Sequence, residues 1–142
     1  MATMNSDRRS FLKASALASA SFGGAAAASA QPTFAPSFAH QVFFWLRNPD
    51  DRSVYDAVVR SLREFRAIKG VRFVHVGAPT VSANPREASV TDATYTLSYI
   101  VLFESKQDEA TYLAHPLHAR FLDRFKDAFS KIIIYDSARV DA

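Results

Sequence analysis

Apolar residues recur along the chain with two periodicities, one typical of strands and one typical of helices. Phe38–Leu46 reads FAHQVFFWL, rich in aromatic and β-branched residues, and predicts a first strand. Pro49–Asp51 then supplies a turn and helix-capping residues. Apolar positions follow at helical spacing until Gly70, which predicts an amphipathic helix. These positions are Val54, Tyr55, Val58, Val59, Leu62, Phe65 and Ile68.

The second half of the chain repeats the strand and helix signals. Val71–Val76 and Thr94–Phe103 predict two strands, separated by a polar loop over Gly77–Asp92. Ser105 and Asp108 form a capping-box pattern that opens a second helical region.

That second helical region is interrupted once and leads into a last strand. Pro116 stands where a helix would begin again, because proline is favoured at the first helical position. Ile132–Tyr135 predicts the final strand. The order βαββαβ predicts an α+β fold of the ferredoxin-like type. The apolar stripe of the region comprises Leu117, Phe121, Phe125 and Phe129.

The predicted strands are apolar on both faces. In the first strand, Val42 and Phe44 alternate with Phe43. Two helices cover only one face of a four-stranded sheet, so the other face would expose a larger apolar patch than soluble monomers usually carry. The polar loop and the short N-terminal lead-in are poor covers for it. We therefore expect a homodimer in which two sheets meet.

The first thirty residues have the composition of an export signal. Arg8 and Arg9 precede Phe-Leu-Lys, a weakly apolar Ala/Ser/Gly run and the small-residue sequence AAAASA. This order resembles the twin-arginine class, although Asp7 stands where that class more often has Ser or Thr. An uncleaved tail and a membrane anchor are the alternatives, but an anchor needs about 20 strongly apolar residues. We expect cleavage after Ala30 and a periplasmic or otherwise extracytoplasmic location.

Cleavage there leaves a lead-in over residues 31–37, one domain over residues 38–142 and a nearly neutral chain. The full sequence has 17 Lys and Arg against 14 Asp and Glu, and removal of three basic residues and one acidic residue leaves 14 against 13, a net charge of +1. No basic cluster remains to bind nucleic acid or a membrane surface. The sequence has no cysteine, which excludes disulfides and thiolate chemistry.

Three local patterns together resemble one known family. They are His40 in HQVFFWL, the sequence FES after the third predicted strand, and YLAHPLHARF over Tyr112–Phe121. In this order they resemble the stress-responsive A/B barrel family, often called Dabb. The resemblance covers nearly all of Phe38–Asp136. It implies a ferredoxin-like protomer that pairs sheet to sheet in a dimeric α/β barrel.

The resemblance also implies a candidate site. Most members of the family have no assigned activity, but a plant polyketide cyclase uses a Tyr-x-x-His-Pro-x-His segment as a cofactor-free acid–base pair. By that resemblance Tyr112 and His118 are candidate catalytic residues, and His40 is a candidate substrate-binding residue. The cyclase has a further pocket histidine where this chain has Leu97. We therefore expect Leu97 to contribute to a more apolar substrate pocket.

The two histidines beside Pro116 each admit more than one role. His115 can accept a hydrogen bond from a free backbone N–H at the helix start. His118 can abstract a proton next to a carbonyl, since imidazole titrates near pH ~6.5, while Tyr112 donates a hydrogen bond to the oxyanion. Alternatively, His118 packs against a strand and hydrogen-bonds a carbonyl.

A metal site is the remaining interpretation of this histidine pair. Imidazole suits zinc, copper or iron. Two nitrogens are too few for a stable site, however, and no carboxylate within the segment completes a ligand set. His40 and His75 could join only through the fold, and both are interpreted as structural groups. We expect no metal and no cofactor.

These observations lead to one main functional hypothesis and two alternatives. The main hypothesis is an exported homodimeric Dabb-domain protein that binds a small, partly apolar molecule, with aldol- or enolisation-type acid–base chemistry if it is an enzyme. The first alternative is a non-enzymatic, stress-associated ligand-binding protein. The second is a haem- or oxygen-handling dimeric α+β barrel.

Overall fold

Four strands in one antiparallel sheet form the framework of the protein. The computed structural model describes residues 35–140. The strands are β1 (Phe38–Leu46), β2 (Val71–Gly77), β3 (Leu97–Phe103) and β4 (Phe129–Ala138). They lie in the order β2-β3-β1-β4, and every neighbouring pair is antiparallel. The predicted ferredoxin-like α+β fold is confirmed.

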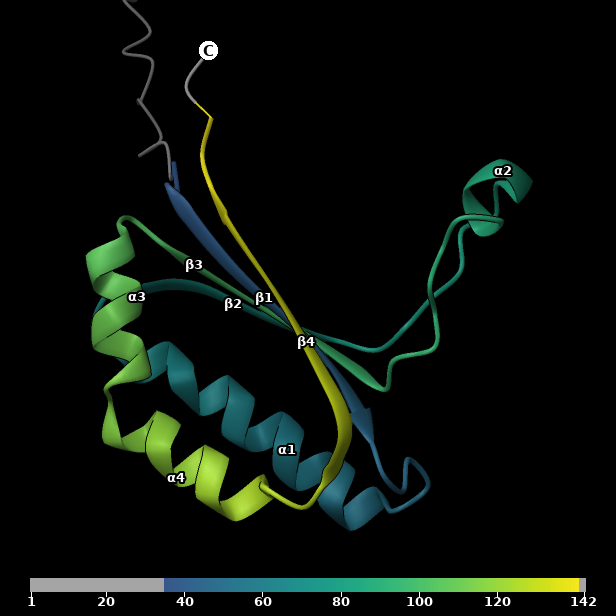
Figure 1. The fold of residues 1–142 in the computed structure, drawn as a ribbon, viewed down its shortest axis with the longest axis horizontal. Coiled ribbons are helices and arrows are strands. Elements are labelled where there is room, and N and C mark those ends of the chain that lie inside the picture. The colour runs from purple at the N-terminus through teal and green to yellow at the C-terminus, as the bar shows by residue number, and fades with distance from the viewer. Residues whose placement is uncertain (1–34, 141–142) are drawn as a thin grey trace, which may run out of the picture. The chain divides into compact units, whose positions relative to one another are not determined.

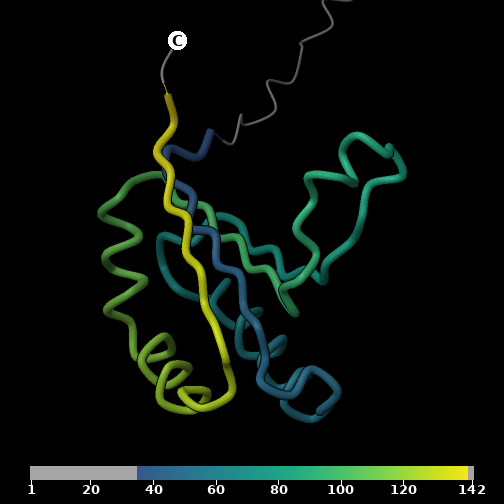
Figure 2. The backbone as a smooth tube through the Cα atoms, turned by 45° about the vertical axis from the view of Figure 1, so that its right-hand side comes forward, coloured from purple at the N-terminus to yellow at the C-terminus, as the bar shows by residue number. Residues whose placement is uncertain are grey.

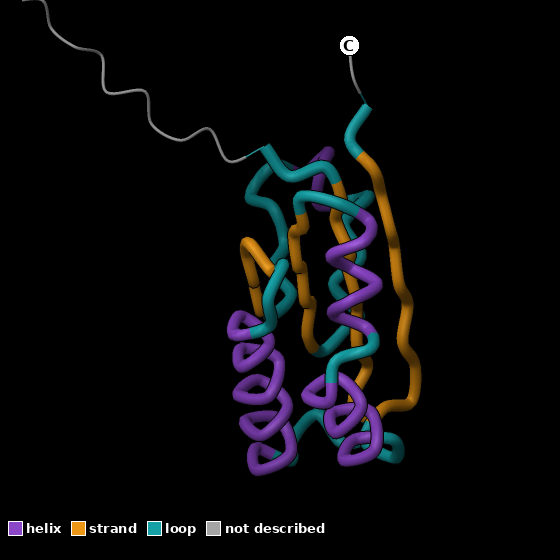
Figure 3. Tube along the Cα trace, turned by 90° about the vertical axis from the view of Figure 1, so that its left-hand side faces the viewer, coloured by secondary structure: helices purple, strands orange, loops and turns teal. Residues whose placement is uncertain are grey.

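Helices cover one face of this sheet. α1 (Arg52–Glu64) continues into the short 3-10 helix η1 (Phe65–Ala67), and α3 (Lys106–Leu113) leads into α4 (Pro116–Phe125). Figure 1 views the sheet nearly edge-on, with α1, α3 and α4 on the same side. Figure 3 shows α1 beside the α3–α4 pair. We call the opposite face of the sheet, which these helices leave open, the outer face.

The predicted helix signals lie at helix boundaries. The Asp51 carboxylate accepts hydrogen bonds from the first free backbone N–H groups of α1. Ser105 caps α3 by accepting from the Asp108 N–H, and its hydroxyl donates to the Asp108 carboxylate at 2.8 Å. Gly70, with a φ of 94°, adopts the left-handed conformation that turns the chain into β2. These local signals fix where the helices begin and end.

Three strands differ from the prediction at their ends, and β2 differs least, ending at Gly77 rather than Val76. β3 begins at Leu97 rather than Thr94, and β4 extends beyond Ile132–Tyr135 at both ends. β4 pairs with the whole length of β1, from Phe38 to Leu46. Backbone pairing with β1 therefore extends β4 through residues whose side chains are polar.

The connection between β2 and β3 projects away from the sheet (Figure 2). It contains a short helix, α2 (Pro85–Ala88), inside the segment predicted as a loop over Gly77–Asp92. Asn84 caps this helix. Four residues are too few to show a helical periodicity, so the sequence pattern missed α2. Val81 and Val90 of this connection are exposed.

The hydrophobic core lies between the sheet and its helices. Burial alternates along β1, and the buried positions include Val42 and Phe44, which face the helices. The largest fully buried side chains are Tyr99, Tyr112, Phe65, Phe103, Leu62, Ile68, Leu97, Val58 and Val101. The core therefore contains two phenol groups as well as apolar side chains.

The outer face carries the second apolar set that the strand pattern predicted. Phe43 packs its ring edge against Tyr95 and Tyr135, at centroid distances of 4.9 and 6.0 Å. Phe73 and Tyr135 remain 48% and 58% exposed. The other large side chains of this face are Trp45, Ile100, Leu102 and Ile133.

The predicted export signal over residues 1–30 and most of the lead-in over residues 31–37 lie outside the described residues. Within residues 35–140, none of the helices has the length and apolar character needed to cross a membrane.

Candidate functional site

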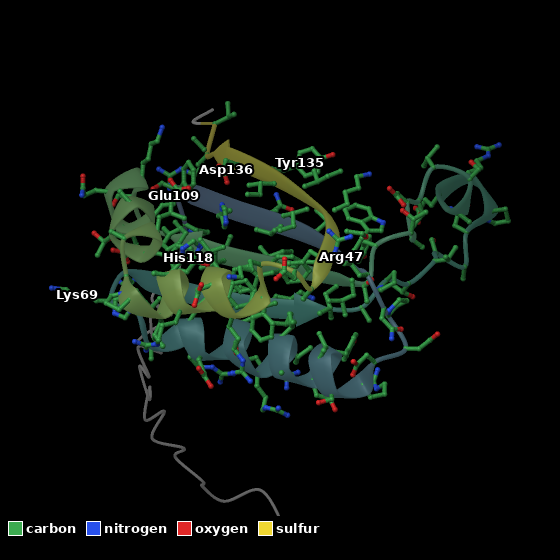
Figure 4. All side chains as sticks on the ribbon, turned by 60° about the horizontal axis from the view of Figure 1, so that its bottom comes forward. Arg47, Lys69, Glu109, His118, Tyr135 and Asp136 are labelled. Carbon is green, nitrogen blue, oxygen red and sulfur yellow. The ribbon has the colours of Figure 1, made fainter. Side chains whose placement is uncertain are left out.

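Ionisable and phenolic side chains gather on the helix-covered side of the sheet, at one end of the core. Glu109 comes from α3, His118 from α4 and Asp136 from β4, and Figure 4 labels all three. Buried polar groups are uncommon in apolar cores, so a group of them marks a candidate site. We call the following residues the polar cluster: His40, Tyr99, Glu109, Tyr112, His118 and Asp136.

Tyr112 and His118 are brought together by the turn between α3 and α4. Their ring centroids lie 5.0 Å apart. Phe65 packs against both, at 5.4 Å from the Tyr112 ring and 5.8 Å from the His118 ring. The two residues proposed from the family resemblance therefore form a pair.

His115 forms the predicted start of α4. Its Nδ1 accepts a hydrogen bond of 3.1 Å from the Leu117 backbone N–H, and Pro116 occupies the first helical position. The capping role is confirmed. Since this bond engages its Nδ1, the ring is fixed at the helix end, and His115 is not counted in the polar cluster.

The surroundings of His118 favour its neutral form. Burial lowers the pKa of this imidazole, and the nearby His40 lowers it further, whereas a hydrogen bond with the Leu113 backbone opposes both effects. A neutral imidazole is the form that accepts a proton. The Leu113 contact also agrees with the alternative in which His118 binds a carbonyl.

Both phenols of the cluster remain protonated at neutral pH. Burial raises the pKa of Tyr112, and the Glu109 carboxylate adds to the increase while Tyr99 opposes it. Burial likewise raises the pKa of Tyr99. The Tyr99 hydroxyl finds no partner with hydrogen-bond geometry among the described residues, although Tyr112 is close enough to raise its pKa further.

His40 links the sheet to the helices at this end of the core. Its Nδ1 lies 2.7 Å from Asp136 Oδ1 and 3.8 Å from Glu109 Oε1. The register between β1 and β4 places His40 directly opposite Asp136. Its ring centroid is 6.1 Å from that of Tyr112. The expectation that His40 is a buried, hydrogen-bonded group is confirmed.

Two members of this arrangement, Glu109 and Asp136, were missed by the sequence analysis. The histidine segment Tyr112–Phe121 contains no carboxylate of its own. Asp136 is separated from His40 by 96 positions, and only the strand register brings it close. The one available signal was that Asp136 directly follows the apolar run Ile132–Tyr135.

Leu97 is not brought to His40. It pairs with Phe44, whereas His40 pairs with Val101 farther along β3. Leu97 is fully buried in the core. The structure thus groups His40, Tyr112 and His118 but places Leu97 elsewhere along the sheet.

A cleft of about 320 Å³ opens between α1 and α4 next to His118. Phe65 and Leu117 are among its lining residues, together with Glu64, Arg120 and Arg124. Phe65 is the lining residue whose ring also contacts Tyr112 and His118.

The lowered pKa of His118 predicts a loss of stability in acid. The ordinary value is 6.5, and the folded value is lower. Between the two, the unfolded chain binds a proton that the folded chain does not, so the free energy of unfolding decreases as the pH falls below about 6.5. In His118→Gln the free energy of unfolding is expected to decrease less over the same pH range. Urea denaturation from about pH 8 to about pH 5 measures the free energy of unfolding of both proteins at each pH. An equal dependence on pH in the two proteins would contradict the assignment.

Comparisons with known proteins agree with this fold. Residues 38–138 match the profile of the stress responsive A/B barrel domain, Dabb. A search of curated proteins gave no match. The chain is similar to a Dabb family protein with a ferredoxin-like fold from Mesorhizobium loti (19% identity over 75% of this chain and 100% of that chain, TM-score 0.58).

Two further solved structures have the same fold. One is a dimeric protein of unknown function from Bacteroides fragilis (21% identity over 72% of this chain and 95% of that chain, TM-score 0.51). The other is a hydroxynitrile lyase from Passiflora edulis (18% identity over 76% of this chain and 98% of that chain, TM-score 0.60). The profile match extends from the first residue of β1 to the last residue of β4. The chain therefore belongs to the stress responsive A/B barrel domain (Dabb) family.

Proposed function

We propose that this Dabb protein is an exported homodimer that binds a small, partly apolar carbonyl compound and promotes its enolisation. The observation that carries the proposal is the contact between Tyr112 and His118, whose rings lie 5.0 Å apart within the polar cluster. A neutral imidazole and a protonated phenol are the base and the hydrogen-bond donor that enolisation requires.

The proposed chemistry moves one proton and needs no cofactor. The free nitrogen of His118 accepts the proton from the carbon next to the carbonyl, and the electron pair of that C–H bond becomes the enolate. The Tyr112 hydroxyl donates a hydrogen bond to the developing oxyanion. His118 then returns the proton to carbon. In an aldol addition the enolate carbon instead attacks a second carbonyl carbon, and the oxygen of that carbonyl takes the proton from His118.

The dimer is proposed from the outer face. Phe43 and Trp45 lie on it beside Tyr135, which remains 58% exposed. A second copy would remove these side chains from water, and burial of apolar area is the dominant favourable contribution to association. The Bacteroides fragilis neighbour is described as dimeric.

The export proposal is supported by the sequence alone. Arg8 and Arg9, the mild apolar run and the AAAASA sequence have the order of a twin-arginine signal. The absence of cysteine from the whole sequence makes folding independent of disulfide formation in either compartment.

One observation favours the second candidate function, which is ligand binding without turnover. Tyr112 is only 1% exposed and packs against Phe65. A hydroxyl buried this deeply favours a structural or binding role, because a catalytic donor has to reach its substrate. No feature of residues 35–140 favours the haem- or oxygen-handling alternative.

Proton exchange at carbon tests the proposal. Phenylacetone in D₂O is incubated with the purified protein, and loss of its α-proton signal is followed by NMR. We expect exchange at least about 100-fold above the buffer rate, the lower end of general-base effects.

Mandelonitrile is a second probe, because one structural neighbour is a hydroxynitrile lyase. Binding without exchange or cleavage supports the second candidate, and neither binding nor reaction contradicts both.

A further inference from the structure

Three side chains able to bind metal converge at one end of the sheet. His40 Nδ1, Glu109 and Asp136 each offer one ligand atom, and these atoms all lie within 4.8 Å of one another. They come from β1, α3 and β4, and Figure 4 labels the two carboxylates. We propose that these three residues form a binding site for a first-row divalent metal ion, with zinc as the ion to test.

The Glu109 carboxylate is the strongest indication that a ligand is missing from this arrangement. Glu109 is only 7% exposed. Its carboxylate lies 3.8 Å from His40 Nδ1, a distance too long for a hydrogen bond. Among the described residues no donor makes a hydrogen bond to this carboxylate. Buried polar side chains usually have such a partner, so the Glu109 carboxylate is available as a ligand.

His40 Nδ1 reaches only one of the two acids with a hydrogen bond. Asp136 Oδ1 lies 2.7 Å from it, whereas Glu109 Oε1 lies 3.8 Å away. A divalent cation placed among the three side chains would contact Nδ1 and both carboxylates at the same time.

The spacing of the ligand atoms fits an ion after small side-chain rotations. Ligands of a tetrahedral zinc ion lie about 3.4 Å apart, given bonds of about 2.1 Å. The distances from Nδ1, 2.7 Å to Asp136 and 3.8 Å to Glu109, fall on either side of that value. Carboxylate torsions alone can equalise them, because glutamate and aspartate rotate without moving the backbone.

The donor set selects the class of metal. One imidazole nitrogen with two carboxylate oxygens suits zinc, manganese or iron, whereas magnesium and calcium prefer oxygen ligands alone. Three protein ligands leave a coordination position open, as in catalytic zinc sites. The Asp136 side chain is 44% exposed, which gives the ion a route from solvent.

This site does not depend on the function proposed for Tyr112 and His118. The three ligands bind the ion whatever occupies the neighbouring pair. Metal binding can therefore be tested in the absence of any organic ligand, and its failure would leave the proton-exchange experiment unaffected.

Calorimetric titration of the chelator-treated full chain with Zn²⁺ tests the site at neutral pH. We expect one ion per chain, and an increase in the melting midpoint of about 12 °C at an ion concentration near 100 times the dissociation constant. Glu109→Gln and Asp136→Asn are each expected to weaken binding at least about 100-fold, because each removes a charged ligand and nearly preserves shape. Mg²⁺ should produce little heat.

Two matched variants identify the site among the histidines. His75→Gln changes an exposed histidine of β2. His115→Asn removes a histidine from the sequence HPLH while keeping a residue that caps helices. Both should bind Zn²⁺ as the unaltered chain does. The proposal is overturned if the unaltered chain binds no Zn²⁺, or if Asp136→Asn, at a partly exposed position, binds as tightly. Circular dichroism of each variant checks that it is folded.

Discussion

Phe43→Asp is expected to convert the proposed dimer into a monomer. Phe43 lies on the outer face, in edge contact with Tyr95 and Tyr135. A two-fold interface contains Phe43 twice, once from each protomer. If each copy contributes about 2 kcal/mol, as buried aromatic anchors do, the dimer dissociation constant rises about 1,000-fold. Sedimentation velocity over a range of concentrations measures the shift.

A matched substitution on the helical side separates this effect from a general effect of added charge. Leu122 lies on α4 and is 51% exposed, so Leu122→Asp introduces the same carboxylate away from the sheet. We expect its dissociation constant to remain unchanged. A monomeric unaltered chain at micromolar concentration would contradict the dimer, as would a Phe43→Asp protein that associates as tightly as the unaltered chain.

His118→Gln is expected to lower proton exchange of phenylacetone by about 100- to 10,000-fold, the usual contribution of a positioned general base. Glutamine is of similar size and can still hydrogen-bond the Leu113 backbone, but it does not accept a proton near neutral pH. The substitution removes the imidazole ring that lies 5.0 Å from the Tyr112 ring and 5.8 Å from the Phe65 ring, measured between centroids. NMR exchange rates at saturating phenylacetone give the comparison.

Tyr112→Phe tests the oxyanion donor in the same assay. The substitution removes one hydroxyl and keeps the ring that packs against Phe65 and Phe103. We expect a loss of about 100-fold, with phenylacetone still bound. Tyr55→Phe is the control, because Tyr55 lies on α1 with Arg52 over its ring, outside the polar cluster. The assignment of both residues is wrong if His118→Gln and Tyr112→Phe leave the exchange rate unchanged.

The losses of exchange rate caused by His118→Gln and by Tyr112→Phe should not add in the double variant. If His118 and Tyr112 act on the same proton transfer, the double variant is expected to be little slower than His118→Gln alone, because without the base the donor has no developing charge to stabilise. Additive losses would mean that the two residues act independently.

The sequence by itself determined the fold class and much of the local structure. Alternation in Phe38–Leu46 and the helical spacing that follows it are short-range patterns, and the elements they predict were found. The capping roles of Ser105 and His115 were also predictable, since a cap bonds backbone groups only two or three residues away. The apolar outer face followed from strand periodicity, because successive side chains point to opposite faces.

Only the tertiary structure decided which polar groups meet. His40 faces Asp136 because β1 and β4 pair in one register, and a shift of one residue would turn Asp136 to the outer face. Glu109 reaches His40 because α3 packs with its Glu109 side toward the sheet. Leu97 lies away from His40 because the β1–β3 register pairs it with Phe44. Strand registers and helix rotations are fixed by the packing of the whole core, so spacing along the chain cannot specify them.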